Sequence, residues 1–260
     1  MEDKIFNLVK ASKKYGSICD ETIYRICCEE FPKYKKEKDV VKSVKNKLHQ
    51  ISQSYMSDGF SRFLKCLGNN ESVDFTELMK LHSSTNERLS FYNEFYDDIF
   101  SVVGSVGSIL DIACGLNPIM LGEYLLKNDY KLEAYIAEDI NINALEAVKC
   151  YYDKTNRPVV VNASDLLTKI PKVSVDVALM LKLVPLLEQQ KKDYYKHVLN
   201  ELSAKFVVVS FPLTTMSGKS VGMLGNYKSL FDDFLVSGNF RLLFTKVYDN
   251  ELLYVITKKM

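Results

Sequence analysis

Several features that mark membrane, secreted and metal-binding proteins are missing from this sequence of 260 residues. No apolar run approaches the roughly 18 residues that a membrane span needs, which excludes an integral membrane protein. The first residues include acids and lead into no long apolar stretch, so we expect no signal peptide and a cytoplasmic location. Six cysteines without a CxxC pair and three histidines without HxxxH or HExxH indicate free thiols and no metal site.

Positive charge is unevenly distributed along the chain, although the net charge is only +1. Residues 1–50 hold 12 Lys+Arg against 8 Asp+Glu, and seven of these lysines fall between Lys33 and Lys47. A basic end on a near-neutral body suggests an anionic partner, of which nucleic acid is the first candidate. The same lysines also fit the solvated face of a helix.

Hydrophobic periodicity divides the chain into two parts. Apolar stripes at helical spacing run through residues 5–9, 23–27 and 40–51, and further helices are expected over 75–81 and 84–103. The S-x-x-E sequence from Ser84 to Glu87 predicts a capping box at the start of the last of these helices.

After Gly107 the pattern alternates between strands and helices. Apolar strands are expected at 108–114, 131–139, 157–163, 175–181 and 205–211, with helix-length segments at 117–128, 141–153 and 186–202. Two closing strands, 240–248 and 251–257, are joined by Asp249-Asn250 in a hairpin turn. The sequence therefore predicts an all-helical domain over 1–104 and a doubly wound α/β domain over 105–260.

Acidic residues follow successive predicted strands, at the edge where such a sheet binds its ligand. Asp111 and Gly115 belong to the end of the first strand, Asp139 closes the second, and Asp165 follows the third. The dinucleotide fingerprint G-x-G-x-x-G is missing, which argues against NAD. Acids at three strand ends without a phosphate loop describe a site for S-adenosylmethionine, although a strand-end aspartate is often only a helix N-cap.

Short motifs in a fixed order make the predicted function more specific. In chain order they are HSSTNERL (82–89), LDIACGLNP (110–118), LKLVPLLE (181–188), SFP (210–212), SGK with GM and NY (217–227), and NELLY (250–254). With these motifs, nearly the whole chain resembles the 16S rRNA guanine-N7 methyltransferases that act at guanine 1405 of the decoding site and confer aminoglycoside resistance.

The resemblance implies a class I methyltransferase domain behind a helical domain that docks on the 30S subunit. It implies that S-adenosylmethionine is bound by Tyr55, His82, Ser83, Ser84, Arg88, Ala113, Gly115, Asp139, Asp165, Leu166, Leu181 and Gln190. Arg88 would hold the methionine carboxylate, Asp139 the ribose, and Asp165 with Leu166 the adenine. Lys182, on the exposed end of the fourth strand, and Lys219 would face the RNA. We expect 16S rRNA within the 30S subunit as partner, no metal and no membrane, and a monomer.

The loop after SFP departs from the family. Thr214 and Val221 stand near positions where relatives show basic residues, and Leu224 replaces an acid. Two potential phosphate contacts are thus absent from the loop nearest the target, which leaves Lys219 as its one basic residue.

Guanine N7 carries an in-plane lone pair, so the reaction needs no general base and we predict no acid–base residue. Catalysis then rests on alignment of the reacting atoms. N7 lies in the deep groove of A-form RNA, so the base must leave its stack, where Tyr227 or Phe211 could stack on it; core packing suits Phe211 better. Two alternatives stay open: a small-molecule or protein methyltransferase with a helical lid, and a non-catalytic ribosome-binding protein.

Overall fold

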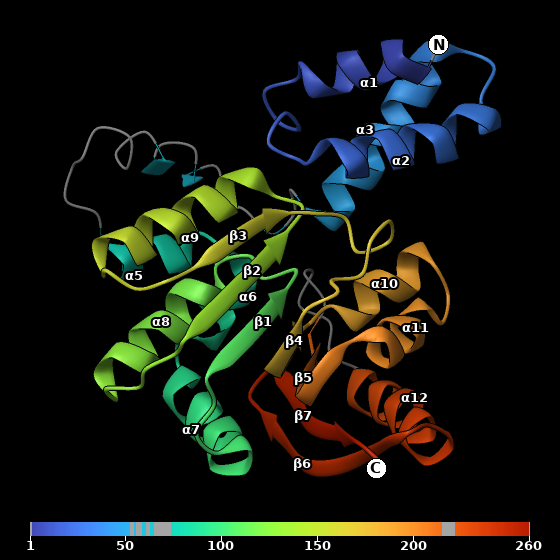
Figure 1. Ribbon diagram of the computed structural model, residues 1–260. Coiled ribbons are helices and arrows are strands. Elements are labelled where there is room, and N and C mark those ends of the chain that lie inside the picture. The colour runs from blue at the N-terminus through green and yellow to red at the C-terminus, as the bar shows by residue number, and fades with distance from the viewer. Residues whose placement is uncertain are drawn as a thin grey trace.

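In the part of the chain that the structure describes, seven strands form one twisted sheet at the centre (Figure 1). The computed structural model describes residues 2–52, 55, 59–60, 63–64, 74–214 and 222–259. The strand order across the sheet is β3-β2-β1-β4-β5-β7-β6, with β1 to β5 parallel and β7 antiparallel to both of its neighbours. The strands are β1 Ser108–Ile112, β2 Ala134–Asp139, β3 Val160–Ala163, β4 Ser174–Leu181, β5 Ser203–Pro212, β6 Phe240–Tyr248 and β7 Glu251–Lys258.

Helices cover both faces of this sheet, because side chains that alternate along each strand enter two different cores. In β4, Val177 and Leu179 join the core under α7, α8 and α9, whereas Ala178 and Met180 join the core under α10, α11 and α12. The helices of this part are α5 Phe75–Lys80, α6 Ser83–Arg88, α7 Tyr92–Val103, α8 Asn117–Lys127, α9 Ile142–Lys154, α10 Val184–Gln190, α11 Tyr194–Glu201 and α12 Met223–Ser237. The predicted fold class is confirmed.

The first helices form a separate unit with its own core. α1 Glu2–Lys10, α2 Asp20–Glu30 and α3 Glu37–Ile51 pack on one another, with a 3-10 turn at Phe31–Lys33 after α2. Their buried residues form one cluster, whereas helices α5 to α7 bury their apolar side chains in the core of the sheet. This grouping differs from the predicted division at residue 104. We call residues 2–52 the helical module.

The helical module is attached to the segment that follows β2. The backbone N–H of Cys19 donates to the carbonyl of Ile140 at 2.8 Å, and the N–H of Ile142 donates to that of Ser17 at 2.8 Å. Ile18 and Asn141 thus form an isolated antiparallel bridge. The module therefore lies over the end of the sheet to which the carboxyl end of β2 points (Figure 1).

Three details of the predicted helices are wrong. Residues 84–103 form two helices, and α6 starts at Ser83 with His82 as its N-cap; no cap hydrogen bond from a side chain is found there among the described residues, so the capping box is absent. The segment 186–202 divides into α10 and α11 because Lys191 is extended and Asp193 is left-handed (φ 61°). Helix α12 was not foreseen. The Asp249-Asn250 turn is confirmed.

Among the described residues, no helix is both long and apolar enough to cross a membrane.

The contact between α8 and α9 gives a test of core packing. A Cβ at Gly122 would lie 2.5 Å from Cε1 of Tyr151, whereas a Cβ at Gly225 in α12 would meet no described atom within 4 Å. We expect Gly122→Ala to lower the free energy of unfolding by about 1–3 kcal/mol through overpacking. Gly225→Ala should raise it by up to about 1 kcal/mol through helix propensity. Denaturant unfolding measures both; equal effects would contradict the packing.

Candidate functional site

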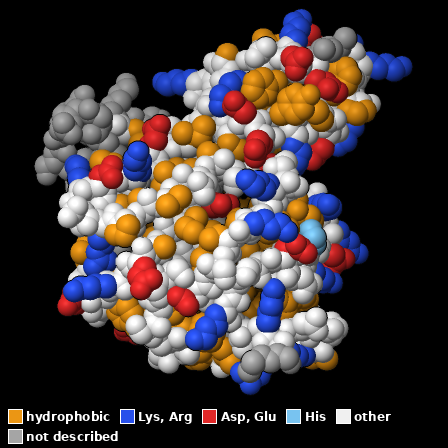
Figure 2. All heavy atoms as spheres, in the orientation of Figure 1, with side chains coloured by type: hydrophobic (Ala, Val, Ile, Leu, Met, Phe, Trp, Pro, Cys, Tyr) orange, Lys and Arg blue, Asp and Glu red, His pale blue; other side chains and the backbone are white. Residues whose placement is uncertain are grey.

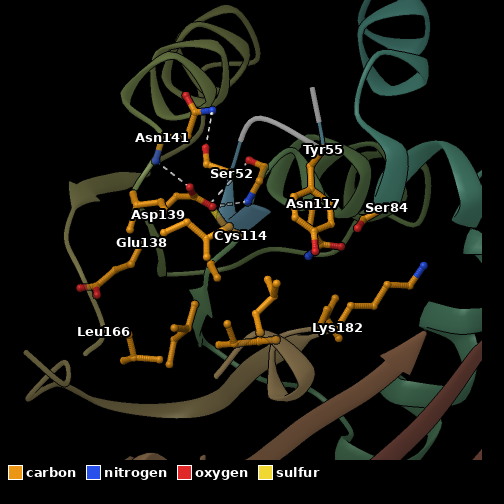
Figure 3. A pocket seen from close by; sticks show the side chains of 18 of the residues that line it. Ser52, Tyr55, Ser84, Cys114, Asn117, Glu138, Asp139, Asn141, Leu166 and Lys182 are labelled. Carbon is orange, nitrogen blue, oxygen red and sulfur yellow. Dashed lines mark hydrogen bonds between the residues drawn. The ribbon is translucent and has the colours of Figure 1, made fainter. Parts of the chain in front are cut away.

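A pocket opens where the carboxyl ends of β1, β2 and β4 meet the helical module (Figure 3). Its lining includes eleven of the twelve predicted cofactor residues: Tyr55, His82, Ser84, Arg88, Ala113, Gly115, Asp139, Asp165, Leu166, Leu181 and Gln190. Ser83, the twelfth, starts α6 and is not among the lining residues of the described chain. The fold thus brings together predicted residues that lie up to 135 positions apart in the sequence, from Tyr55 to Gln190.

The backbone after β1 curves tightly around one wall of the pocket. Ala113 and Gly115 both adopt left-handed conformations, with φ of 53° and 51°. A Cβ at Gly115 would lie 2.6 Å from Cε1 of His82, so glycine permits the close contact of this turn with the imidazole ring. Burial, and then the charges of Arg88 and Lys182, lower the pKa of His82 to about 3. The ring is therefore neutral at physiological pH.

A buried ion pair forms beside this turn. Nε and Nη2 of Arg88 donate to the two carboxylate oxygens of Glu251, at 3.1 and 2.6 Å, and both side chains are at most 1% exposed. Burial alone would raise the pKa of Glu251. The charges of Arg88 and Lys182 have the larger combined effect and hold this pKa below the usual value for glutamate. The ring of Phe95 lies 4.7 Å from the Arg88 guanidinium carbon.

Lys182 belongs to the same charged cluster, and its predicted exposure is wrong. Its side chain is only 7% exposed, and Nζ lies 2.6 Å from Glu87 and 3.4 Å from Glu251. The residue follows β4 in a left-handed conformation (φ 57°), held by a hydrogen bond from its N–H to the Ser210 carbonyl at 3.0 Å. Lys182 is therefore a wall residue of the pocket with two acidic partners, because the chain turns inward where the strand ends.

Asn117 links Arg88 to Asp111. Its side-chain oxygen accepts from Nη1 of Arg88 at 2.9 Å, and its Nδ2 donates to Oδ2 of Asp111 at 2.8 Å. Tyr135 also donates to Oδ2 of Asp111, at 2.7 Å. Oδ1 of Asp111 is buried and has no hydrogen-bond partner among the described residues, although Asp111 lines the pocket. Burial raises the pKa of Asp111 to about 7.

Two neighbouring carboxylates stand at the end of β2. Asp139 accepts from the backbone N–H of Gly115 at 2.8 Å and of Asn141 at 2.7 Å, so it braces the turn after β1 (Figure 3). Glu138 accepts from Ser164 at 2.9 Å and points away from Asp139 (Figure 3). Both residues line the pocket and are half-buried.

Of the residues expected to face the RNA, Lys182 alone lies in the pocket wall among those that the structure describes. Tyr227 lies on α12, half-buried, and stacks on the fully buried Phe211 with ring centroids 5.1 Å apart. Phe211 is thus a core residue, as its sequence context favoured. Tyr227 is not among the pocket-lining residues of the described chain. Lys219 lies outside the described residues.

Sequence reasoning missed several residues of the site: Glu251, Asn117, Glu138, Arg25 and Ser52. Asn117 and Glu251 lie inside motifs that the resemblance used, so their position in LDIACGLNP and NELLY was the available signal. Arg25 had none, because its contacts are with residues 140 and 165 positions away. In the described part of the chain, no cluster of three or more His, Cys, Asp or Glu residues could hold a metal ion.

The strand order and the pocket at the carboxyl ends of the strands define a class I methyltransferase. A family model described as "Ribosomal RNA methyltransferase (FmrO)" matches residues 11–255. A Serratia marcescens protein named 16S rRNA (guanine(1405)-N(7))-methyltransferase is 32% identical over 251 residues, which is 96% of each chain. A Proteus mirabilis protein of the same name is 31% identical over 96% of this chain and 95% of its own.

A solved structure of the 16S rRNA methyltransferase RmtF in complex with S-adenosyl-L-homocysteine is 30% identical and superimposes with a TM-score of 0.86, over 99% of this chain and 98% of that one. The chain belongs to the FmrO family of ribosomal RNA methyltransferases, whose cofactor is S-adenosylmethionine.

The Arg88–Glu251 pair predicts a large effect on stability. Glu251→Ala removes the carboxylate that pairs with two buried cations, Arg88 and Lys182. It should lower the free energy of unfolding by about 3–5 kcal/mol. Glu94→Ala is the matched control, since Glu94 pairs with Lys246 while 60% exposed; it should cost less than about 1 kcal/mol. Chemical denaturation compares them. A similar small loss for both variants would show that the buried pair contributes little.

Asp111 predicts a specific pH dependence. Because its folded pKa, about 7, exceeds the ordinary value of 3.8, the neutral carboxyl stabilises the fold below pH 4. This contribution is lost as pH rises through about 7. The free energy of unfolding of the wild type should therefore fall relative to that of Asp111→Asn between pH 4 and 7, with a limiting slope of about 1.4 kcal/mol per pH unit. A constant difference across this range would contradict the raised pKa.

Proposed function

We propose that this enzyme transfers a methyl group from S-adenosylmethionine to N7 of guanine 1405 of 16S rRNA within the 30S subunit, and so confers aminoglycoside resistance. Family membership over residues 11–255, together with a pocket that gathers the residues of the cofactor motifs, carries this proposal. Curated relatives at 31–32% identity over nearly full length are named for this reaction. We further propose that the enzyme acts as a monomer, without a metal, in the cytoplasm.

The pocket suits the methionine end of S-adenosylmethionine. The unpartnered Oδ1 of Asp111 would accept from the methionine ammonium, and ionised Asp111 would compensate its charge. Arg88 retains N–H groups beyond those given to Glu251 and Asn117, and these would donate to the methionine carboxylate. Glu251 fixes the plane of the guanidinium, so Arg88 offers these donors in a set direction.

The nucleoside end would be held by the carboxyl ends of β2 and β3. Asp139 already accepts two backbone N–H groups, so its remaining lone pairs and the carboxylate of Glu138 are both available to ribose hydroxyls. Leu166 and Leu181 would contact the faces of the adenine, and Asp165 its amino edge.

Bound S-adenosylmethionine supplies an electrophilic methyl group on a sulfonium. Because guanine N7 already has a lone pair, the chain needs only to hold this nitrogen in line with the methyl carbon. The neutral His82 ring packs against Gly115 and would fix the shape of the wall beside the methionine. Lys182, anchored by Glu87 and Glu251, would orient the flipped guanine or its phosphate at the pocket edge, and Lys219 and Tyr227 would contact the RNA farther out.

The decisive experiment offers labelled S-adenosylmethionine with purified 30S subunits, naked 16S rRNA, or no RNA. We expect label in 30S only, and primer extension after cleavage at 7-methylguanine should stop at the nucleotide on the 3′ side of guanine 1405. Label in protein or in small molecules would favour the alternative methyltransferase with a helical lid. Calorimetric binding of S-adenosylmethionine without transfer to any substrate would favour a ribosome-binding protein that has lost its activity.

The helical module should bind rRNA phosphates through its free lysines. Lys47 and Lys33 pair with Glu30 at 2.8 and 2.7 Å, and Figure 2 shows charges of both signs interspersed on the module, so its lysines are not equivalent. Lys35, Lys36 and Lys42 are exposed. Charge reversal of these three should weaken 30S binding and reduce its salt dependence.

The control variant for this prediction is Lys47→Glu, in which the reversed charge faces two module glutamates, Glu29 and Glu30. It should destabilise the module more than the exposed reversals do. Binding of S-adenosylmethionine should persist in the triple variant. If the triple variant bound 30S as the wild type does over a salt series, these lysines would be solvent-exposed residues without a role in RNA binding.

A further inference from the structure

One arginine of the helical module reaches into the nucleoside end of the pocket. Arg25, on α2, donates from Nε to Oδ2 of Asp165 at 2.8 Å and from Nη2 to Oε1 of Gln190 at 2.9 Å. The third guanidinium nitrogen, Nη1, donates to Oε1 of Glu29 on the same helix at 2.7 Å. The side chains of Arg25 and Asp165 are only 15% and 4% exposed, so water screens this ion pair little.

These contacts fix the orientation of both partners. Oδ1 of Asp165 accepts from the N–H of Leu167 at 2.9 Å, so each carboxylate oxygen has one protein donor and keeps a free lone pair. Nε2 of Gln190 donates to the carbonyl of Leu186 at 3.2 Å, so the amide cannot turn over without losing two hydrogen bonds. Asp165 and Gln190 thus face the pocket in orientations that Arg25 holds.

The module contributes more than this one side chain to the pocket wall. Thr22, Ile51 and Ser52 line the pocket, and Ser52 lies 3.5 Å from the amide of Asn141, the N-cap of α9 (Figure 3). The module is also joined to the chain after β2 by backbone hydrogen bonds at Ile140 and Ile142. Every one of these contacts falls on a segment that follows a strand of the cofactor site.

We propose that Arg25 is a positioning residue for the adenine of the cofactor, and that through it the helical module and the cofactor site stabilise each other. This inference rests on the proposed function. Without Arg25, the buried Asp165 carboxylate would lose its cation and the Gln190 amide its fixed orientation, so recognition of the adenine amino group would weaken. If binding of the module to 30S tightens this contact, thermodynamic reciprocity requires the cofactor to strengthen 30S binding by the same factor.

Calorimetry with S-adenosylhomocysteine and with S-inosylhomocysteine, in which an oxygen replaces the adenine amino group, tests the proposal. We expect Arg25→Ala to lower affinity for S-adenosylhomocysteine roughly tenfold or more, and to reduce the preference over the inosine analogue. Arg25→Lys retains a cation for Asp165 but cannot fork to Gln190, so it should fall between Ala and wild type. Arg241→Ala, at an exposed position of β6, is the matched control and should bind as wild type does.

A second measurement compares 30S affinity with and without S-adenosylhomocysteine. The wild type should bind 30S more tightly when the ligand is present, and Arg25→Ala should lose most of this difference. Circular dichroism establishes that each variant is folded, and Arg25→Lys serves if the alanine variant is not. Unchanged ligand preference in the folded variants overturns the inference alone. Failure of the wild type to bind S-adenosylhomocysteine overturns the proposed function and the inference with it.

Discussion

The fully buried ion pair between Arg88 and Glu251 is the constraint on which the site depends most. It joins helix α6 to the first residue of strand β7, across 163 positions of sequence. Burial of either charge without the other would be costly, so the position of Arg88 in the pocket wall needs both helix α6 and strand β7. Stability of the fold and the shape of this part of the pocket therefore depend on the same contact.

The same pair changes the electrostatic character of the pocket. Arg88 and Lys182 face Glu251 and Glu87, so the two cations and two anions compensate each other. The pocket consequently offers directed N–H donors more than a positive potential. A zwitterionic amino acid end suits such a surface, because it brings one charge of each sign.

The central strands of the sheet could be predicted from sequence because they are buried on both faces. The segments that became β4 and β5 are near-continuous apolar runs, a local signal that needs no tertiary information. Helix α12 carries apolar residues at helical spacing, and Tyr227, Leu230, Phe231, Phe234 and Leu235 pack in the core, so its signal was present in the sequence but was not used. The capping box at Ser84 failed for a tertiary reason, since the Glu87 carboxylate pairs with Lys182, which is 95 positions away.

The candidate site shows a similar limit. Motifs predicted which positions meet, as Ala113, Gly115 and Leu166 illustrate, but not how the side chains are engaged. Asp139 looked like a ribose ligand and also braces a turn, which depends on the backbone direction at Gly115 and Asn141. Arg25 carried only the pattern of a surface residue, four positions before Glu29 on one helix, and its partners in the catalytic domain left no trace in the local sequence.

A pocket whose wall is shared between the sheet and a helical module has a consequence for selective inhibition. A compound confined to the strand ends would meet the same kinds of groups that any class I methyltransferase presents to S-adenosylmethionine. A compound extended from Asp111 past Asp165 to Arg25 and Thr22 would contact side chains that belong to the module alone. Such a compound would distinguish this enzyme from methyltransferases that lack the module, because it would bind where the module contacts the α/β domain.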